Sequence, residues 1–236
     1  MMQAFFDGVG VIMIYIAIAA GVMMTALAIL TIPDELFRKA LHFVLLGVYI
    51  PLLSAFEAWW MAAVFALALI VVFYPVLALL ERIPHFSAFV NERKGGEFKS
   101  SLVLAVGMMA FSVTVCWGWL DDKYLVLACI YAWGVGDAFA ALIGKRFGRH
   151  KIRCRYADAH KSVEGSAAMC FCSFASVLTV LLIRGGLAIP VCLFIALIAA
   201  VVCTAAELCA KNGLDTVICP ACAMAVILSL TAIFGG

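Results

Sequence analysis

Charged residues are scarce in this chain. Asp, Glu, Lys and Arg make up 13% of the 236 residues, whereas about a quarter of a soluble globular domain is charged. Hydrophobic residues make up 67% of the chain. This balance excludes a soluble globular protein and predicts a single integral membrane domain over residues 1–236, with no room for a separate soluble domain.

The chain also lacks the short motifs of several enzyme classes. It has no G-x-x-x-x-G-K-[ST] loop, no H-R-D kinase segment and no H-E-x-x-H zinc motif, so soluble-type NTPases and zinc proteases are excluded. Most of its ten cysteines lie within apolar runs, where a thiol behaves as a small hydrophobe. Cys219 and Cys222 have C-x-x-C spacing but lack the βαβ surroundings of a redox site. The N-terminus lacks the basic region and cleavage site of a signal peptide, so we expect its first apolar run to be retained.

Apolar runs dominate what is present. A membrane-spanning helix needs roughly 20 mostly apolar residues. The sequence therefore predicts an all-α polytopic membrane protein with about eight transmembrane helices, at residues 8–30, 38–53, 58–80, 101–120, 124–143, 166–183, 187–208 and 216–234. The second run is the shortest, because Arg38, Lys39 and His42 crowd its start.

Basic residues are distributed unevenly between the predicted connections. One set of alternate connections holds 14 of the 16 Lys and Arg residues, and the opposite set holds only Lys123 and Arg184. By the positive-inside rule the basic side is cytoplasmic, so both termini are expected outside and the functional loops inside. The predicted location is a bacterial-type inner membrane or its equivalent, with the active site on the cytoplasmic face.

Residues 133–166 combine an intramembrane acid with glycines and cations. Asp137 lies well inside the fifth predicted span, where a carboxylate is costly unless it faces a polar cavity or a cation. The alternative is a helix–helix hydrogen bond or a buried ion pair. Gly144 and Gly148 flank Arg146, an arrangement that brings backbone N–H groups and cations together as phosphate sites do. The alternative is a basic topogenic loop that contacts anionic headgroups.

The next predicted helix starts with a charged pair. Lys161 and Glu164 stand three residues apart, so they are expected to share one face, and Gly165 opens a helix whose N-terminus favours an anion. The alternative is a capping arrangement with a surface ion pair. His85 and His150 are expected to be incidental loop residues.

An early cluster is expected on the same side of the membrane. Arg38 and His42 are four residues apart and project together from a helix, with Lys39 one step round it. The alternative is an ordinary basic helix end, although a histidine one turn into an apolar helix is less natural there.

A late cluster repeats at four-residue steps, in Glu207, Lys211 and Asp215. Together with Asp137 and Glu164, Glu207 offers the oxygen ligands that Mg²⁺ prefers, since this ion takes one or two carboxylates plus substrate phosphates.

These segments resemble the CTP-dependent polyprenol and lipid-alcohol kinases, a family that includes dolichol kinase, phytol kinase and CTP-dependent diacylglycerol kinase. The family pattern D-x-x-A-x-x-x-G-x-x-x-G is met by Asp137, Ala140, Gly144 and Gly148. Its K-K-T-x-E-G segment is met by Lys161, Glu164 and Gly165, with His160 in the first lysine place, Ser162 for Thr, and a longer spacer before it. Its R-K-x-x-H matches Arg38, Lys39 and His42, and its late acidic motif resembles Glu207, Gly213, Asp215 and Pro220, with Thr216 in place of the usual Asn.

The resemblance implies Mg²⁺-dependent transfer of the γ-phosphate of CTP to the hydroxyl of a membrane lipid alcohol, of the polyprenol, phytol, dolichol or diacylglycerol type. It implies catalytic roles for Asp137, His42, Lys161 and Glu164. It implies nucleotide or phosphate binding by Arg38, Lys39, Gly144, Arg146, Gly148, Lys161 and Gly165, and metal binding by Asp137, Glu207 and Asp215. His42 is favoured as the base and Asp137 as the metal ligand. No nucleic acid partner is expected, and a homo-oligomer is left open.

Two alternatives stay open. The central pattern also resembles phosphatidate cytidylyltransferases, which make CDP-lipid from CTP with Mg²⁺. Those enzymes carry a late Lys-Asp followed by a His-Gly-Gly and Asp-Arg run, which this chain lacks. The other alternative is non-enzymatic lipid binding or transport, although the chain shows no pair of matching halves with interrupted helices.

Overall fold

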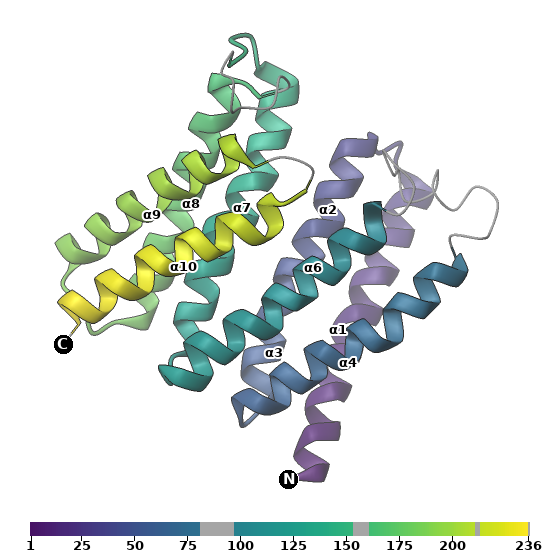
Figure 1. Ribbon diagram of the computed structural model, residues 1–236. Helices are drawn as coiled ribbons and strands as arrows, with labels where there is room; N and C mark the ends of the chain where they lie inside the picture. Colours follow the sequence, from purple (N-terminus) through teal and green to yellow (C-terminus); the bar gives the residue numbers. More distant parts are fainter. Residues whose placement is uncertain (81–96, 153–160, 211–212, 236) are drawn as a thin grey trace. The chain divides into compact units, whose positions relative to one another are not determined.

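The computed structural model describes residues 1–80, 97–152, 161–210 and 213–235 (Figure 1). The helices in these ranges are α1 (Met2–Ile29), α2 (Asp34–Gly47), α3 (Tyr49–Ala55), α4 (Trp59–Leu80), α6 (Glu97–Ser112), the π-helix η1 (Val113–Trp119), α7 (Lys123–Phe147), α8 (Val163–Arg184), α9 (Ile189–Cys209) and α10 (Asp215–Phe234). Within the described ranges the fold is all-α, and extended pairing is limited to one isolated bridge. Eight helical stretches are long and apolar enough to cross a membrane, which confirms the predicted number.

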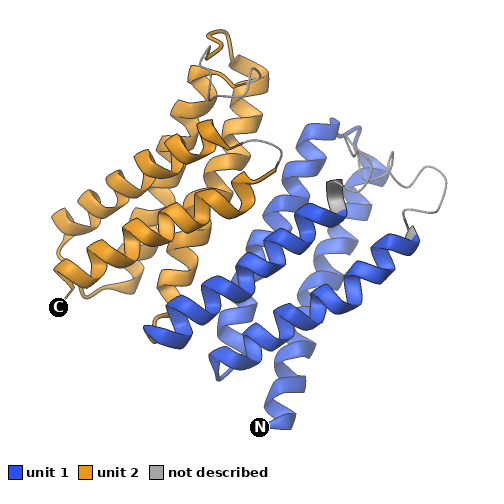
Figure 2. Cartoon of the chain, viewed as in Figure 1, with its two compact units in different colours: residues 1–120 blue, residues 121–236 orange. Residues whose placement is uncertain are grey.

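The chain divides into two compact units, Met1–Leu120 and Asp121–Gly236, shown in different colours in Figure 2. Each unit contains four of the eight membrane-spanning stretches. The sequence-based expectation of one integral membrane domain over residues 1–236 stays a prediction.

In unit 1, the second predicted span is interrupted. α2 ends at Gly47, Val48 forms a turn, and α3 begins at Tyr49. Pro51 explains the interruption, because proline has no N–H to donate to the Gly47 carbonyl four residues earlier and its ring crowds that carbonyl. Tyr15 of α1 lies against this point, where its hydroxyl donates to the carbonyl of Val44 at 2.9 Å. A side chain at Gly47 would clash with the Tyr15 hydroxyl, so the glycine permits the close approach of α1.

A second irregularity in unit 1 lies at the end of α6, where the chain passes directly into the π-helix η1. Gly118 of η1 packs against the Trp59 ring at the start of α4, and a Cβ at Gly118 would lie 2.9 Å from that ring. Because Gly118 has no side chain, its backbone can lie directly against the indole.

Unit 2 is a ring of four helices. α7 packs on α8, α8 on α9, α9 on α10, and α10 returns to α7. α7 and α8 make the most extensive contact, through small residues. Gly136 lies against Met169 and Ser173, and the Ser173 hydroxyl donates to the Ala132 carbonyl. Such close contacts and hydrogen bonds matter here because lipid provides little hydrophobic drive for helices to associate.

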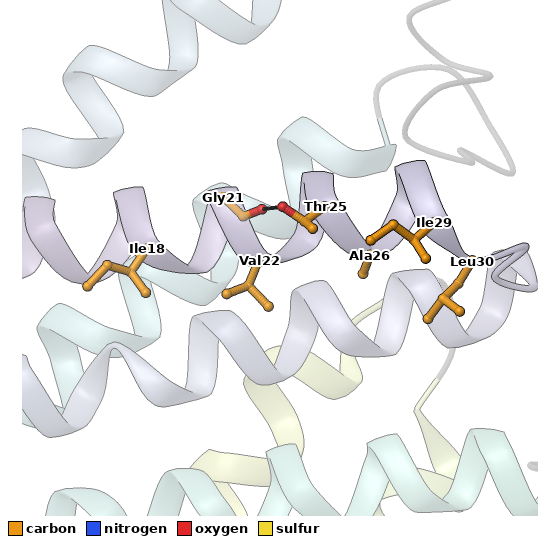
Figure 3. Close-up of a pocket in the computed structure, with 7 residues that line it drawn as sticks. All are labelled: Ile18, Gly21, Val22, Thr25, Ala26, Ile29 and Leu30. Atoms are coloured by element: carbon orange, nitrogen blue, oxygen red, sulfur yellow. Dashed lines mark hydrogen bonds between the residues drawn. The ribbon is translucent and has the colours of Figure 1, made fainter.

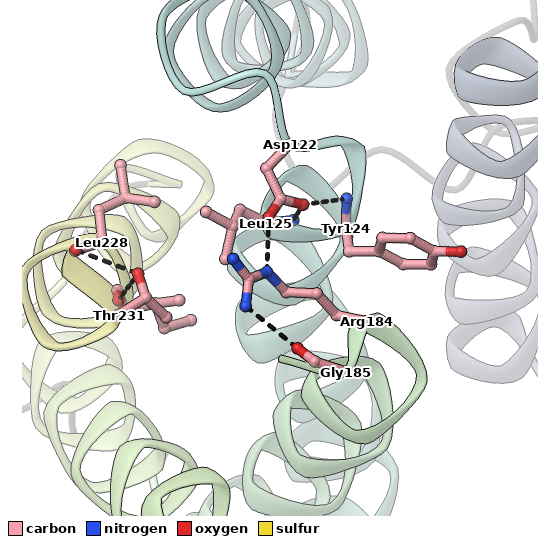
Figure 4. Close-up of polar contacts among 8 residues, drawn as sticks. Asp122, Tyr124, Leu125, Arg184, Gly185, Leu228 and Thr231 are labelled. Atoms are coloured by element: carbon pink, nitrogen blue, oxygen red, sulfur yellow. Dashed lines mark hydrogen bonds and ion pairs between the residues drawn. The ribbon is translucent and has the colours of Figure 1, made fainter. Parts of the chain in front are cut away.

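One end of unit 2 is held by an ion pair (Figure 4). Asp122 caps α7 by accepting hydrogen bonds from the backbone N–H groups of Tyr124 and Leu125, at 2.9 and 3.2 Å. Its second oxygen lies 2.5 Å from Nε of Arg184, the last residue of α8, which also donates to the Gly185 carbonyl at 3.2 Å. Asp122 thus joins the start of α7 to the end of α8.

Gly165→Ala should destabilise unit 2. Its Cβ would lie 2.9 Å from the Ala140 carbonyl oxygen and 3.2 Å from the Gly144 Cα, and neither backbone atom can rotate away. Overpacking of this kind typically costs about 1–3 kcal/mol of unfolding free energy. Thermal unfolding of the purified protein in detergent measures the loss. Gly107→Ala is the control, because no heavy atom lies within 4 Å of its Cβ; equal midpoints for the two variants would contradict the packing described for α7 and α8.

Asp122→Asn and Asp122→Ala should separate the cap from the ion pair. Asparagine still accepts the backbone N–H groups but carries no charge, whereas alanine loses both interactions. Loss of an N-cap costs about 1 kcal/mol, so the alanine variant should unfold at the lower temperature in the same assay. An alanine variant as stable as the asparagine variant would show that capping by Asp122 contributes nothing.

Candidate functional site

Charged residues gather at the end of unit 2 opposite the Asp122–Arg184 pair. Here α7 and α9 end, and α8 and α10 begin. We use the term charged end for the residues Lys145, Arg146, Arg149, His150, Lys151, Lys161, Glu164, Glu207 and Asp215. This part of the chain contains most of the residues of unit 2 that the sequence predicts to be functional.

The start of α8 is positioned by a short backbone pairing. Lys151 and Ser162 form an antiparallel bridge, and the Ile152 N–H donates to the Lys161 carbonyl at 3.0 Å. Ser162 is 3% exposed and caps α8 by accepting the Gly165 N–H at 3.2 Å. The backbone of Lys161 is therefore held between the bridge and the first turn of α8, while its side chain extends beyond them.

Lys161 reaches from the start of α8 to the end of α9. Its Nζ lies 2.9 Å from Oε1 of Glu207 and also donates to the backbone carbonyls of Glu207 and Ala210, the latter at 3.5 Å. The Lys161 and Glu207 side chains are only 18% and 12% exposed. Carbonyls at a helix C-terminus have no intrahelical donors, and the negative end of the helix dipole attracts a cation. Lys161 therefore neutralises Glu207 and caps α9 at the same time.

Two further carboxylates act on Glu207. Asp137 of α7 and Asp215, the first residue of α10, both lie close enough to Glu207 for Coulombic repulsion. Both side chains are half-buried. The three residues predicted as metal ligands therefore contribute negative charge to one part of unit 2, from three different helices.

The donor chemistry at this end fits a Mg²⁺ ion that shares its ligands with a phosphate. Mg²⁺ in proteins is bound through one or two carboxylates and completes its coordination with substrate phosphates and water. Asp137, Glu207 and Asp215 offer such carboxylates. Across residues 1–80, 97–152, 161–210 and 213–235, no group of three or more His, Cys, Asp or Glu side chains is arranged to hold a metal ion by itself.

Glu164 pairs with a histidine that was expected to be incidental. His150 Nδ1 lies 2.7 Å from Glu164 Oε1, and the His150 backbone N–H donates to both carboxylate oxygens at 3.2 and 3.3 Å. His150 therefore has a defined structural partner, whereas the expectation that it has no functional role stays a prediction. Glu164 and Lys161 also differ in their partners, although they are close in sequence. The only sign of the His150 contact in the sequence is the place of Glu164 in the first turn of α8, where a carboxylate can accept preceding backbone N–H groups.

The predicted phosphate-binding glycines pack against one another. α7 continues through Gly144, past the predicted end of the span at residue 143. The Gly148 N–H donates to the Gly144 carbonyl at 3.1 Å, and the Gly165 N–H to Ser162 Oγ at 3.2 Å. A Cβ at Gly148 would lie 2.6 Å from Ser162 Oγ. Residues 144–147 are thus helical, and the three glycines have a packing role; their nucleotide role stays a prediction.

Arg146 is exposed at the end of α7. Its guanidinium carbon lies 5.5 Å from the centroid of the Phe147 ring, and Lys145 and Arg149 beside it are also exposed. Exposed cations of this kind suit either a nucleotide phosphate or an anionic lipid headgroup.

The early cluster lies on α2 of unit 1. Arg38 Nη1 is 3.3 Å from Oε2 of Glu35, one turn earlier. Lys39 is only 8% exposed and His42 is half-buried, and both interact with neighbouring groups. A lysine this buried is uncommon, because a buried ammonium requires partners, and it is not typical of an ordinary basic helix end. Three other residues singled out in the sequence, His85, His160 and Lys211, lie outside the described ranges. So do five more of the 14 basic residues counted above: Arg82, Arg93, Lys94, Arg153 and Arg155.

An apolar pocket of about 570 Å³ lies on α1 (Figure 3). It is lined by Ile18, Gly21, Val22, Thr25, Ala26, Ile29 and Leu30. The Thr25 hydroxyl donates to the Gly21 carbonyl at 2.7 Å. This lining carries no ionisable group, so the pocket can accommodate hydrocarbon but supplies no catalytic chemistry.

Lys161→Met should destabilise the protein more than the double variant Lys161→Met/Glu207→Gln. Removing one partner of a buried ion pair leaves the other charge uncompensated, at a cost of about 3–5 kcal/mol, whereas removing both charges costs less. Unfolding by denaturant in detergent gives both values. Lys145→Met removes an exposed cation at the same end and should stay within about 0.5 kcal/mol of the parent. Equal losses in the single and double variants would show that Lys161 and Glu207 are not coupled.

Comparisons of the chain with protein-family models, with curated proteins and with solved structures found no match. The most informative feature is therefore the geometry of the charged end. There, Lys161 contacts Glu207, and Asp137 and Asp215 lie within Coulombic range of the same carboxylate.

Proposed function

We propose that this chain is a membrane enzyme that transfers the γ-phosphate of CTP to the hydroxyl of a lipid alcohol, with Mg²⁺ as cofactor. One observation carries the proposal: Lys161 and Glu207, which are far apart in the sequence, are in contact at 2.9 Å in unit 2. Asp137 and Asp215 lie within Coulombic range of the same carboxylate. Each of the four belongs to a segment that resembles the lipid-alcohol kinases. One cation and three carboxylates are a suitable set for a metal-bound triphosphate.

The carboxylates Asp137, Glu207 and Asp215 are the residues that would hold Mg²⁺. When bound, the ion neutralises charge on the β- and γ-phosphate oxygens, which phosphoryl transfer requires. Asp215 lies in the first turn of α10, where the positive end of the helix dipole stabilises its ionised form. Asp137 projects from the body of α7, so it marks the deepest part of this proposed site.

Lys161 and Arg146 are the cations that would bind phosphate oxygens. Arginine offers a planar fork of donors, and lysine a compact charge on a flexible stem. Phosphoryl transfer needs positioning and charge neutralisation more than covalent assistance from the protein, and these two side chains are suited to both tasks. The roles of Arg38 and Lys39 in phosphate binding, and of His42 as the base for the lipid hydroxyl, stay predictions.

The membrane setting supports a lipid acceptor. The charged end belongs to the connections that hold 14 of the 16 basic residues, so we place it on the cytoplasmic side, with both termini outside. A lipid hydroxyl would enter from the side, between helices, at the depth of the headgroups. Hydrophobic sites discriminate poorly between apolar chains, so the lipid class has to be identified by assay.

The decisive experiment supplies the purified protein with Mg²⁺, mixed lipid alcohols, phosphatidate, and CTP labelled at either the γ- or the α-phosphate. We expect lipid to be labelled from the γ position only. Label from the α position would instead identify a cytidylyltransferase. No label from either position, with ATP also inactive, would favour non-enzymatic lipid binding or transport.

Asp137→Asn should lower the rate of γ-phosphate transfer by about 100-fold or more, as removal of one electrostatic stabiliser does in other enzymes. Asp122→Asn makes the same substitution at the opposite end of unit 2 and should leave the rate near that of the parent. The two variants are compared at equal amounts of folded protein, measured by gel filtration. Full activity in Asp137→Asn would remove this residue from the site.

A further inference from the structure

Lys161 has two roles that a single conformation cannot satisfy. In the proposed function it binds phosphate oxygens, and Glu207 belongs to the carboxylates that hold the metal. In the structure the two side chains bind each other, with Nζ 2.9 Å from Oε1. A carboxylate that is already neutralised by an ammonium is a weak ligand for a divalent ion. An ammonium bonded to a carboxylate and to backbone carbonyls likewise has fewer donors to offer a phosphate.

The surroundings of the Lys161 ammonium are those of a small cation. It contacts three oxygen atoms, which are Oε1 and the carbonyl of Glu207 and, at 3.5 Å, the carbonyl of Ala210. These oxygens lie at the C-terminus of α9, where the helix dipole favours positive charge. Asp137 and Asp215 add negative charge to the same location. The lysine therefore occupies a position that a metal ion would also favour.

We infer that Lys161 is a built-in competitor for the carboxylate site, and that metal and nucleotide must bind together to displace it. This inference rests on the proposed function. When the metal-bound triphosphate arrives, Lys161 transfers from Glu207 to the phosphate oxygens, and Glu207 becomes a metal ligand. Because the metal ion alone offers Lys161 no new partner, the metal ion binds weakly without the nucleotide.

The exchange requires only a side-chain movement. The Lys161 carbonyl accepts a hydrogen bond from the Ile152 N–H, and Ser162 next to it caps α8, so the backbone of Lys161 is held in place. Its side chain, by contrast, has a flexible four-carbon stem. The ammonium can therefore leave Glu207 while α8 stays in place. Mg²⁺ and CTP are therefore expected to bind together. Without CTP, the carboxylates hold no tightly bound metal ion.

Binding of Mn²⁺, a spectroscopic substitute for Mg²⁺, tests the inference on the chain of residues 1–236 in detergent. Free Mn²⁺ is measured by electron paramagnetic resonance in the absence of nucleotide. Lys161→Met should bind Mn²⁺ at least tenfold more tightly than the parent, because the competing ammonium is gone and the carboxylates remain. Lys145→Met removes one exposed positive charge at the same end and should change the affinity less than twofold. Adding Glu207→Gln to Lys161→Met should abolish the gain.

Affinity in Lys161→Met no higher than in the parent or in Lys145→Met would overturn the inference. If Lys161→Met fails to fold, Lys161→Gln replaces it, since glutamine still donates to the carbonyls at the end of α9 but carries no charge. Mn²⁺ should then raise the unfolding temperature of Lys161→Gln and not that of the parent, and equal shifts would contradict the competition. The labelled-CTP assay on the parent protein is independent of this measurement. Tighter Mn²⁺ binding by Lys161→Met, with no phosphate transfer by the parent, rejects the kinase proposal alone. Phosphate transfer by the parent, with no tighter Mn²⁺ binding by Lys161→Met, rejects the competition alone.

Discussion

The close approach of α7 and α8 is the contact on which unit 2 depends. Gly136 and Gly165 leave room for the neighbouring backbone or side chain at two levels of the crossing, and the Ser173 hydroxyl bonds across it to the Ala132 carbonyl. In a membrane, where lipid is as apolar as the side chains, such fit and hydrogen bonding must hold the helices together. The crossing brings the start of α8 to the end of α7, and from there Lys161 reaches α9.

The number and approximate position of the candidate spans could be predicted from the apolar runs of the sequence. In a bilayer every backbone polar group must be satisfied within the segment, so a long apolar run has few alternatives to a helix. The irregularities could not be predicted as well. Pro51 is visible in the sequence, but the turn at Val48 also depends on Tyr15, which packs on Gly47 from another helix. α7 passes through Gly144 because packing against Gly165 outweighs the poor helix propensity of glycine.

The types of residue at the candidate site followed from the sequence, but their partners did not. Lys161 and Glu207 are 46 residues apart, and no local spacing relates them. The sequence spacing pairs Lys161 with Glu164, and it groups Glu207 with other carboxylates as a possible metal ligand, but it does not pair Lys161 with Glu207. The contact between them depends on how α8 and α9 pack, a property of the whole unit. The same applies to His150, whose partner Glu164 is 14 residues away in the sequence.

The ion pair of Asp122 and Arg184 makes unit 2 mechanically asymmetric. A guanidinium is a planar fork whose donors are fixed relative to one another, and here it joins a helix cap to a helix end. The opposite end is joined by Lys161, whose ammonium lies on a flexible stem that can rotate about several bonds while the backbone stays in place. We therefore expect the Arg184 end to be the more rigid end of unit 2, so that displacements of α7 and α8 grow with distance from it.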